Sequence, residues 1–431
     1  MTRLTRGSRA ALALLTALPL ALVGSASALA TEDPAIQDGL WYYTVPGIDQ
    51  IQASGTTGAG VTVAIIDSTI NPDAPDLVGT SLSVRPTYCD WNGDGALDPG
   101  TSVQRDAEHA TAIAGLIVGT GTGAGGRPGT KGVAPGVTLL HYASVFGDNS
   151  CSDLPQQIDA AVADGADIIN MSFAGAFLSE DEAAAIARAE RAGVVLVAAS
   201  NNRGGSDLGW PASANGVISV EDADVNQQLT PNAVTSPRLS VVAPGVGIRV
   251  PLLDEDTGAW DVYGISKGSS YAAAWVSGVI ALAWSAHPDA TGNQMIQALL
   301  RTTGQASGGE PARIDDSWGY GTVSVRKLIA LDPTTLPDVN PLVSDAPDAQ
   351  PAYDEIVRAA PTSAPTATQS PEPDQPTAAP TRAVGTESDE GGSATTLLVI
   401  GGALVLLAIG GAVTAAVILN RRNHHPNAKG A

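Results

Sequence analysis

Three polar residues of the chain have the types and positions from which a nucleophile and its base could be built. Asp67 ends a short apolar run, His109 opens a run of small residues, and Ser270 begins an Ala-rich stretch. A serine hydroxyl attacks a carbonyl only when an adjacent base takes its proton, and a histidine held by a carboxylate is such a base. Taken singly, each residue also has a structural interpretation, because acids end strands as turns or caps and serines cap helices.

The other four histidines fit this chemistry less well. His141 lies inside an apolar run, where we expect a core histidine with satisfied hydrogen bonds, and His287 lies in a His-Pro-Asp turn. His424 and His425 belong to the C-terminal tail. His109 is therefore the candidate base.

The elements that must position these residues follow from the hydrophobic pattern. Runs rich in Val and Ile are continuous, not alternating, which is typical of parallel strands buried on both faces. We expect strands at 61–67, 137–145, 166–172, 194–200 and 217–220. Ala-rich stretches between them predict helices at 110–119, 154–164, 179–191 and 270–286. This alternation indicates an α/β fold, a parallel central sheet with helices on both faces, with functional groups at the carboxyl ends of its strands.

Composition narrows the function classes. The 431 residues include 44 Asp plus Glu against 22 Lys plus Arg, a formal net charge of −22. This acidity offers no basic surface for phosphates, so we expect no nucleic-acid partner. A hydrophobic fraction of 44% excludes a wholly disordered chain. Two cysteines are too few for a disulfide scaffold or a Cys-rich zinc site.

The N-terminus has the features of an export signal. Residues 1–30 combine an Arg-containing start, an apolar run at 10–23 and the small-residue exit Ala28-Leu29-Ala30, which predicts a cleaved signal peptide. The extension at 31–59 contains an aromatic run that starts at Trp41, and we expect it to pack on the domain that follows.

The C-terminus has the features of a membrane anchor. Residues 331–393 are rich in Pro, Ser, Thr and Asp and predict a disordered stalk. The apolar segment 394–419 is long enough for one transmembrane helix across the ~30 Å hydrocarbon core. Arg421 and Arg422 follow it, so the positive-inside rule places the tail 420–431 in the cytoplasm. We expect a single-pass protein of the cell membrane whose catalytic domain is extracytoplasmic.

In the chain order Asp67, His109, Ser270, the three candidates resemble the triad of the subtilisin-type serine proteases. The surrounding sequences resemble the family's motifs: Val63-Ala64-Ile65-Ile66-Asp67-Ser68, His109-Ala110-Thr111-Ala112-Ile113-Ala114-Gly115 and Gly268-Ser269-Ser270-Tyr271-Ala272-Ala273-Ala274-Trp275-Val276-Ser277-Gly278. Val197-Ala198-Ala199-Ser200-Asn201 resembles the strand that delivers the oxyanion-hole asparagine. The resemblance implies a subtilisin-like catalytic domain at 60–330, in which Asp67, His109 and Ser270 are catalytic and Asn201 binds the oxyanion.

Four positions differ from the family pattern. Thr69 and Ala110 stand where glycine is usual, Ser269 replaces threonine, and Ala274 replaces proline. These changes exchange small residues for small ones and remove no group that does chemistry.

The resemblance also implies where a substrate would lie. Substrate strands in this family pair with an exposed edge by β-augmentation. Ser172, Phe173 and Ala174 match one side of that cleft, with alanine where the family has glycine, so we expect a tighter floor in the first pocket. Ala198 and Ala199, followed by Ser200, are expected to form the wall of that pocket.

Two further features of the exported domain concern covalent and metal bonds. Cys89 and Cys151 lie in loops, and we expect one disulfide between them, with free thiols as the alternative. The segment 90–98 has the spacing of a calcium loop, but its twelfth position is Thr101 and not the bidentate glutamate. We therefore expect a solvated loop and assign no metal or cofactor, with calcium as the alternative.

The order of segments resembles one branch of the family, the mycosins, which are membrane-anchored subtilases tied to type VII secretion. The Ser motif follows the mycosin form, and 31–59 is too short for the folded prodomain of secreted subtilisins. This resemblance implies a serine endopeptidase with protein or peptide substrates and the type VII secretion membrane complex as partner. Two alternatives stay open: a cell-surface subtilase of broad specificity, and a structural subunit of the secretion complex.

Overall fold

The computed structural model describes residues 38–90, 94–144, 153–304 and 308–357. The predicted signal peptide, transmembrane helix (394–419) and cytoplasmic tail lie outside these residues, as does Cys151. Within the described ranges, every helix is too short or too polar to cross a membrane.

Seven strands form the central sheet, and each neighbouring pair is parallel. Their order across the sheet is β2 (Leu82–Val84), β5 (Thr138–Ala143), β1 (Thr62–Asp67), β6 (Ile168–Met171), β7 (Val195–Ala199), β8 (Ile218–Ala223) and β9 (Val241–Pro244). The five inner strands are those expected from the hydrophobic runs. The two edge strands were not predicted: β2 has three half-buried residues, and β9 is a buried run of four that ends in Pro244, a residue that argues against a strand.

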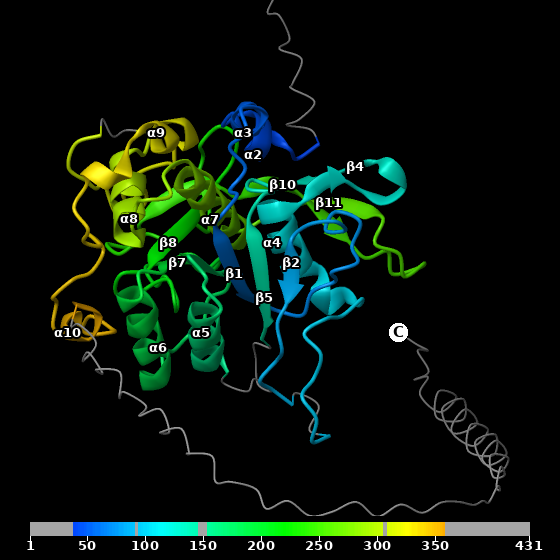
Figure 1. The fold of residues 1–431 in the computed structure, drawn as a ribbon, viewed down its shortest axis with the longest axis horizontal. Coiled ribbons are helices and arrows are strands. Elements are labelled where there is room, and N and C mark those ends of the chain that lie inside the picture. The colour runs from blue at the N-terminus through cyan, green and yellow to red at the C-terminus, as the bar shows by residue number, and fades with distance from the viewer. Residues whose placement is uncertain (1–37, 91–93, 145–152, 305–307, 358–431) are drawn as a thin grey trace, which may run out of the picture. The chain divides into compact units, whose positions relative to one another are not determined.

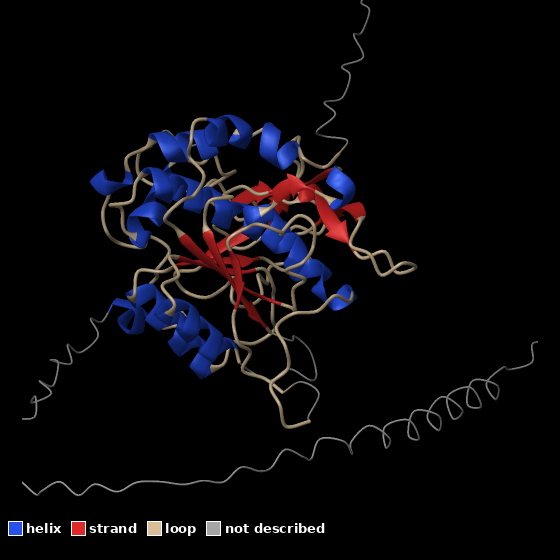
Figure 2. Cartoon of the chain, turned by 45° about the vertical axis from the view of Figure 1, so that its right-hand side comes forward, coloured by secondary structure: helices blue, strands red, loops and turns tan. Residues whose placement is uncertain are grey.

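Helices cover both faces of the sheet (Figures 1 and 2). The helices are α4 (Glu108–Val118), α5 (Leu154–Ala163), α6 (Glu180–Arg191), α7 (Ser269–Ala286) and α8 (Gly292–Arg301), with short 3₁₀ helices η1 (Arg105–Ala107) and η2 (Ala124–Gly126). Alternate residues of β1 belong to different cores: Val63 and Ile65 pack in one with α4, α7 and α8, and Ala64 and Ile66 pack in the other with α5 and α6. The predicted α/β fold with a parallel sheet is confirmed.

Two small antiparallel sheets lie beside the main one. β3 (Thr120–Thr122) pairs with β4 (Pro128–Lys131), and β10 (Val246–Leu252) pairs with β11 (Val262–Lys267). Only Gly268 separates β11 from the first turn of α7. The hairpin therefore determines where Ser270 enters the fold.

The N-terminal extension packs on the domain from residue 38 onward, through α2 (Trp41–Thr44) and α3 (Ile48–Ala53). The indole of Trp41 donates to the carbonyl of Val246 (3.0 Å), and the indole of Trp275 donates to the carbonyl of Tyr42 (2.9 Å). Tyr42 is fully buried. These contacts make the extension part of the folded domain.

Residues 331–357, expected as the start of the disordered stalk, are instead folded. After α9 (Val325–Ala330), this C-terminal segment forms η3 (Pro333–Thr335) and α10 (Tyr353–Val357). Its main chain is bound by side chains of the domain: Gln294 donates to the carbonyl of Leu336 (3.0 Å), and Asn215 donates to the carbonyl of Pro351 (3.1 Å). The stalk prediction was wrong for these residues. From composition alone we expected their main-chain carbonyls to be hydrated, but side-chain amides of the domain bind them.

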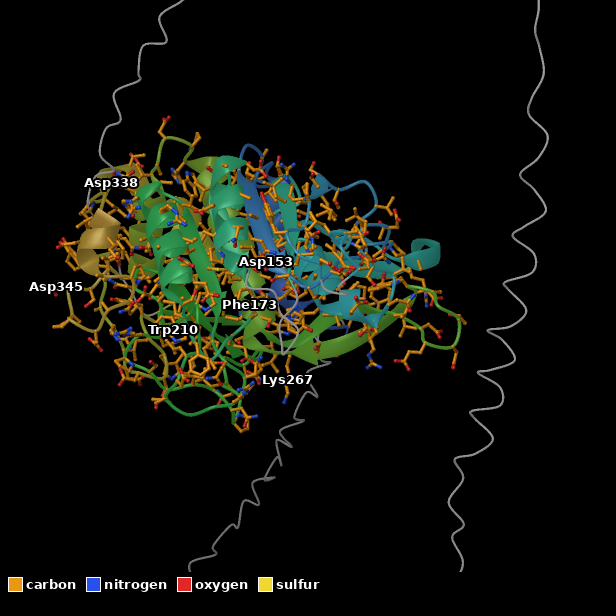
Figure 3. All side chains as sticks on the ribbon, turned by 90° about the horizontal axis from the view of Figure 1, so that it is seen from below. Asp153, Phe173, Trp210, Lys267, Asp338 and Asp345 are labelled. Atoms are coloured by element: carbon orange, nitrogen blue, oxygen red, sulfur yellow. The ribbon has the colours of Figure 1, made fainter. Side chains whose placement is uncertain are left out.

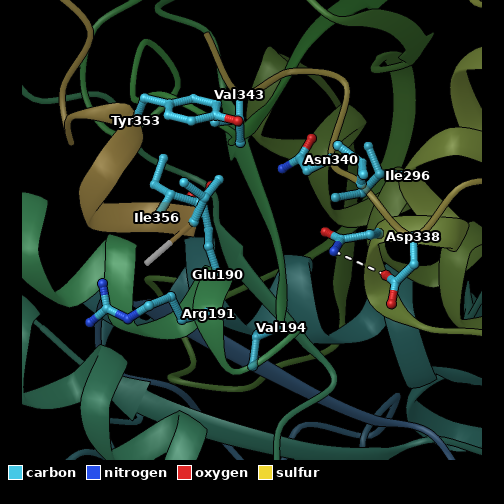
Figure 4. A pocket seen from close by; sticks show the side chains of 12 residues that line it. Glu190, Arg191, Val194, Ile296, Asp338, Asn340, Val343, Tyr353 and Ile356 are labelled. Carbon is cyan, nitrogen blue, oxygen red and sulfur yellow. Dashed lines mark hydrogen bonds between the residues drawn. The ribbon is translucent and has the colours of Figure 1, made fainter. Parts of the chain in front are cut away.

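A pocket of about 380 Å³ lies between this C-terminal segment and α6 and α8 (Figure 4). Val343, Tyr353 and Ile356 line it from the segment, and Glu190 lines it from α6. Both carboxylate oxygens of Glu190 are buried and have no hydrogen-bond partner among the described residues. Burial raises the pKa of this carboxyl well above its usual range.

Candidate active site

Asp67 and His109 lie in contact at the carboxyl end of the sheet. Asp67 is the last residue of β1, and His109 is the second residue of α4, which crosses beside it. The Nδ1 atom of His109 is 2.7 Å from Oδ1 of Asp67. A neutral imidazole that donates from Nδ1 leaves Nε2 free to accept a proton, as a general base must.

The two residues differ in exposure. Asp67 is buried, whereas His109 is half-exposed, so the base is open to a substrate and its orienting acid is not. Burial of the imidazole opposes protonation, but the charge and the hydrogen bond of Asp67 outweigh it, so that the pKa of His109 is raised. A raised pKa makes the imidazole a stronger base for the serine proton.

Ser270 is the second residue of α7, and the ring of its neighbour Tyr271 has its centroid 6.2 Å from that of His109. Gly268, at φ +151°, turns the chain from β11 into the helix in a conformation that other residues avoid. The Ser270 hydroxyl donates to the carbonyl of Ser172 (2.9 Å) and not to His109 in this structure. Rotation about the Cα–Cβ bond redirects it, and catalytic hydrogen bonds are often unformed before substrate binds.

Asn201 follows β7, two strands from Asp67 in the sheet order. Its side-chain amide donates to the carbonyl of Asp207, and its Oδ1 accepts from the main chain of Arg203 (2.7 Å). The amide has a second N–H, and the main-chain N–H of Ser270 lies at the start of α7, where the helix dipole favours negative charge. The structure thus places the predicted oxyanion donors at the ends of neighbouring elements.

The predicted substrate-binding residues differ in accessibility. Ser172 is buried, Phe173 is half-buried and Ala174 is exposed. Ala198 and Ala199 are buried in opposite cores, so only the main chain of this strand is left for the expected pocket wall.

The segment that follows Ser172 is held against the loop after β7. Gly175 and Trp210 exchange two main-chain hydrogen bonds, of 2.7 and 3.0 Å. Phe173 and Trp210 pack on the same core, and Figure 3 shows both on the side of the domain where Lys267 ends β11. A Cβ atom placed on Gly209 would lie 2.9 Å from that of Ala174, so the alanine methyl group lies close against Gly209.

Sequence reasoning missed the residues that support the nucleophile. Asn202 accepts from the main-chain N–H of Ser269 (3.0 Å) and from its hydroxyl (3.1 Å). Ser269 also donates to the carbonyl of Ser200, and the Ser200 hydroxyl donates to Glu221 (3.0 Å). Burial, with the neighbouring Asp222, raises the pKa of Glu221. The sequence offered one signal for this support: a second asparagine, Asn202, directly follows the predicted oxyanion residue Asn201.

The predicted disulfide and the calcium alternative each involve residues outside the described ranges. Cys89 is buried, but Cys151 lies outside the described residues, so the bridge stays a prediction. Asp90 and Asp94 accept main-chain N–H groups within their own loop, and residues 91–93 lie outside the described ranges. In the described part of the chain, no three acidic, His or Cys side chains are grouped to hold a metal ion.

Comparisons with known proteins agree with this geometry. Residues 58–321 match the subtilase family of peptidases. The chain is 30% identical to subtilisin DY of Bacillus licheniformis over 289 residues, which cover 65% of this chain and 94% of that protein. It is 31% identical to alkaline elastase YaB of a Bacillus species over 270 residues, covering 60% of this chain and 65% of the elastase. Among solved structures, fervidolysin from Fervidobacterium pennivorans, a keratinolytic enzyme related to subtilisin, superimposes with a TM-score of 0.56 at 26% identity, covering 68% of this chain and 45% of fervidolysin.

One assignment follows from three observations: the Asp67–His109 pair, the serine at the start of α7, and the family match over most of the described domain. The chain belongs to the subtilase family, as a subtilisin-like serine protease.

Proposed function

We propose that this serine protease is a membrane-anchored extracytoplasmic endopeptidase of the mycosin type, which processes exported proteins beside a type VII secretion complex. The chemistry rests on the 2.7 Å contact between His109 and Asp67. It also rests on Ser270 in the first turn of α7, whose neighbour Tyr271 lies beside the His109 ring. The location rests on the predicted signal peptide and on the charge-free apolar segment near the C-terminus.

In the proposed reaction, Ser270 rotates from the Ser172 carbonyl toward Nε2 of His109 and attacks the scissile carbonyl carbon. His109 takes the hydroxyl proton, and Asp67 stabilises the imidazolium through Nδ1–H. The negative charge that develops on the carbonyl oxygen is stabilised by the N–H of Ser270 and by the Asn201 amide. His109 then gives the proton to the leaving amine, and water repeats the sequence to release the acyl group.

We further propose that the protease prefers a small residue on the acyl side of the cleaved bond. The methyl group of Ala174 lies against Gly209, where the family's glycine would leave open space. One of the similar proteins is named an elastase, which agrees with a narrow pocket. A pocket that excludes one methylene discriminates by about 10- to 200-fold.

The chemistry is tested by labelling the purified full-length protein with a fluorophosphonate, which reacts with an activated serine. We expect labelling of the wild type at Ser270 and none of the Ser270→Ala or His109→Ala variants. A folded wild type that neither labels nor cleaves peptides would favour the structural-subunit alternative.

The location is tested separately with a tag placed after Ala431. In intact cells, added protease should remove the catalytic domain and leave the tag protected. Purification through the same tag should recover the membrane components of a type VII secretion system. A tag that is cleaved in intact cells contradicts the anchor. A protected tag that brings down no secretion component favours the broad-specificity surface protease.

A further inference from the structure

His141 is a buried histidine that the catalytic scheme does not use. It lies on β5, directly opposite Ile65 of β1, and its side chain is fully buried. Its Nε2 atom is 2.9 Å from the main-chain carbonyl oxygen of Ser68. The carbonyl can only accept, so the neutral imidazole carries its proton on Nε2 and donates it to Ser68.

Ser68 is the residue that orients Asp67. Its main-chain N–H donates to Oδ1 of Asp67 (2.7 Å), the same oxygen that contacts His109, and its hydroxyl lies 3.3 Å from that oxygen. The other carboxylate oxygen, Oδ2, is buried and has no hydrogen-bond partner among the described residues. The direction of the Asp67 carboxylate therefore depends on contacts at one oxygen, and two of them come from Ser68.

We propose that His141 is a positioning residue of the protease, which holds the main chain of Ser68 so that the Asp67 carboxylate faces Nδ1 of His109. The proposal rests on the protease function of the Asp67–His109–Ser270 site. It explains why a histidine stands in the middle of an apolar strand, where a hydrocarbon side chain would fill the space but leave the Ser68 carbonyl without its donor.

Burial keeps the imidazole of His141 neutral, although the nearest charge favours its protonated form. Asp67 faces it from β1. From the β2 side, the main-chain N–H of Arg85 binds the carbonyl of His141, while the Arg85 guanidinium pairs with Asp164 at 2.7 Å. Burial lowers the pKa of His141 to about 4, against the opposing effects of Asp67 and the Ser68 bond. At neutral pH His141 thus acts as a hydrogen-bond donor without adding charge beside Asp67.

The test compares three substitutions in the full-length protein. His141→Leu removes the donor, His141→Asn shortens it out of reach of Ser68, and His141→Gln places an amide N–H near the original Nε2 position. We expect the first two to lower kcat by about 10- to 100-fold with little change in KM, because a misplaced catalytic group costs this much. His141→Gln should recover most of the rate.

A second readout separates positioning from stability. The raised pKa of His109 depends on Asp67, while Tyr271 and Glu108 are its other titratable neighbours. If Asp67 turns away, the acid limb of the kcat/KM profile should move to lower pH in the Leu and Asn variants and stay in place in the Gln variant. The control is His287→Leu, which removes a comparable bond from Nε2 to the carbonyl of Ile329 (2.9 Å) outside the catalytic contacts described above, and should leave kcat and the profile unchanged.

Wild-type kcat and pH profile in folded His141→Leu or His141→Asn would overturn the positioning role. So would a Gln variant as slow as the Asn variant. If His141→Leu does not fold, kcat and the pH profile of His141→Asn are compared with those of His141→Gln, and this comparison tests the positioning role. A wild type that fails to turn over would overturn the protease function instead, and wild-type labelling distinguishes that failure from this one.

Discussion

The hydroxyl of Ser270 donates to the main-chain carbonyl of Ser172, and the hydroxyl of Ser172 donates to the main-chain carbonyl of Ser270, at 2.9 and 2.8 Å. This reciprocal pair joins the end of β6 to the start of α7. The candidate nucleophile is therefore connected to the predicted substrate segment, which begins directly after β6.

Ser172→Ala should weaken this junction and leave the catalytic groups in place. Loss of one buried hydrogen bond costs about 1 kcal/mol, or roughly 1.5 °C in Tm for a domain of about 300 residues. Thermal unfolding measures the shift, and Ser54→Ala, which removes an exposed hydroxyl, is the control. An unchanged Tm would mean that the pair contributes nothing to stability.

Asn201→Ala should reduce kcat by about 10²–10³, a magnitude that itself comes from the oxyanion-hole asparagine of a subtilisin. KM should change little, because the amide acts on charge that develops in the transition state. Asn226→Ala, which alters an exposed turn, is the matched control for kinetics with a peptide substrate. A higher KM with an unchanged kcat would instead mean that Asn201 contributes to binding of the substrate in its ground state.

Ala174→Gly should widen the first pocket. We expect kcat/KM for peptides with Phe on the acyl side to rise about tenfold, with little change for Ala, because one methyl group is removed from the floor. Ala176→Gly makes the same exchange two residues along the exposed loop and controls for added backbone freedom. Equal gains in both variants would refer the effect to loop mobility and not to pocket size.

Glu190→Gln should stabilise the protein at alkaline pH. The pKa of Glu190 is raised by burial, so the folded state holds a proton that the unfolded state releases. The stability from this difference is fully present below the ordinary glutamate pKa of about 4.3 and is lost as the pH rises through the folded value. The Tm advantage of the variant should therefore grow with pH. The control is Glu180→Gln, which makes the same exchange at the exposed start of α6. A difference in Tm between Glu190→Gln and the wild type that does not change with pH would contradict the raised pKa of Glu190.

Cys89 and Cys151 should be joined by a disulfide in the full-length protein. Mass spectrometry of the non-reduced full-length chain should find the two peptides linked, and reduction should separate them. Complete alkylation of both thiols without reductant would refute the bridge. The prediction is specific because the sequence offers no other cysteine.

The inner strands and the candidate catalytic residues could be predicted from the sequence because both have strong local signals. Continuous apolar runs mark buried parallel strands, and short motifs mark Asp67, His109 and Ser270. The role proposed for His141 had no such signal, since it depends on a contact between β5 and the loop after β1 that only the sheet order creates. Residues 331–357 carried a misleading signal, because their proline content is typical of a linker. In the structure they are folded, and Asn215 and Gln294 bind their main chain.

The C-terminal segment packs near Glu190 and Asn215, which precede β7 and β8, whereas Asp67 and Asn201 lie at or beyond the opposite, carboxyl ends of the strands. Val357, the last described residue, thus lies on the side of the domain away from Asp67 and Asn201. Immobilising the enzyme on beads through a handle placed directly after Val357 should therefore leave the candidate active site facing bulk solution. Folded proteins as bulky as the domain itself should then reach Ser270 without steric hindrance from the support.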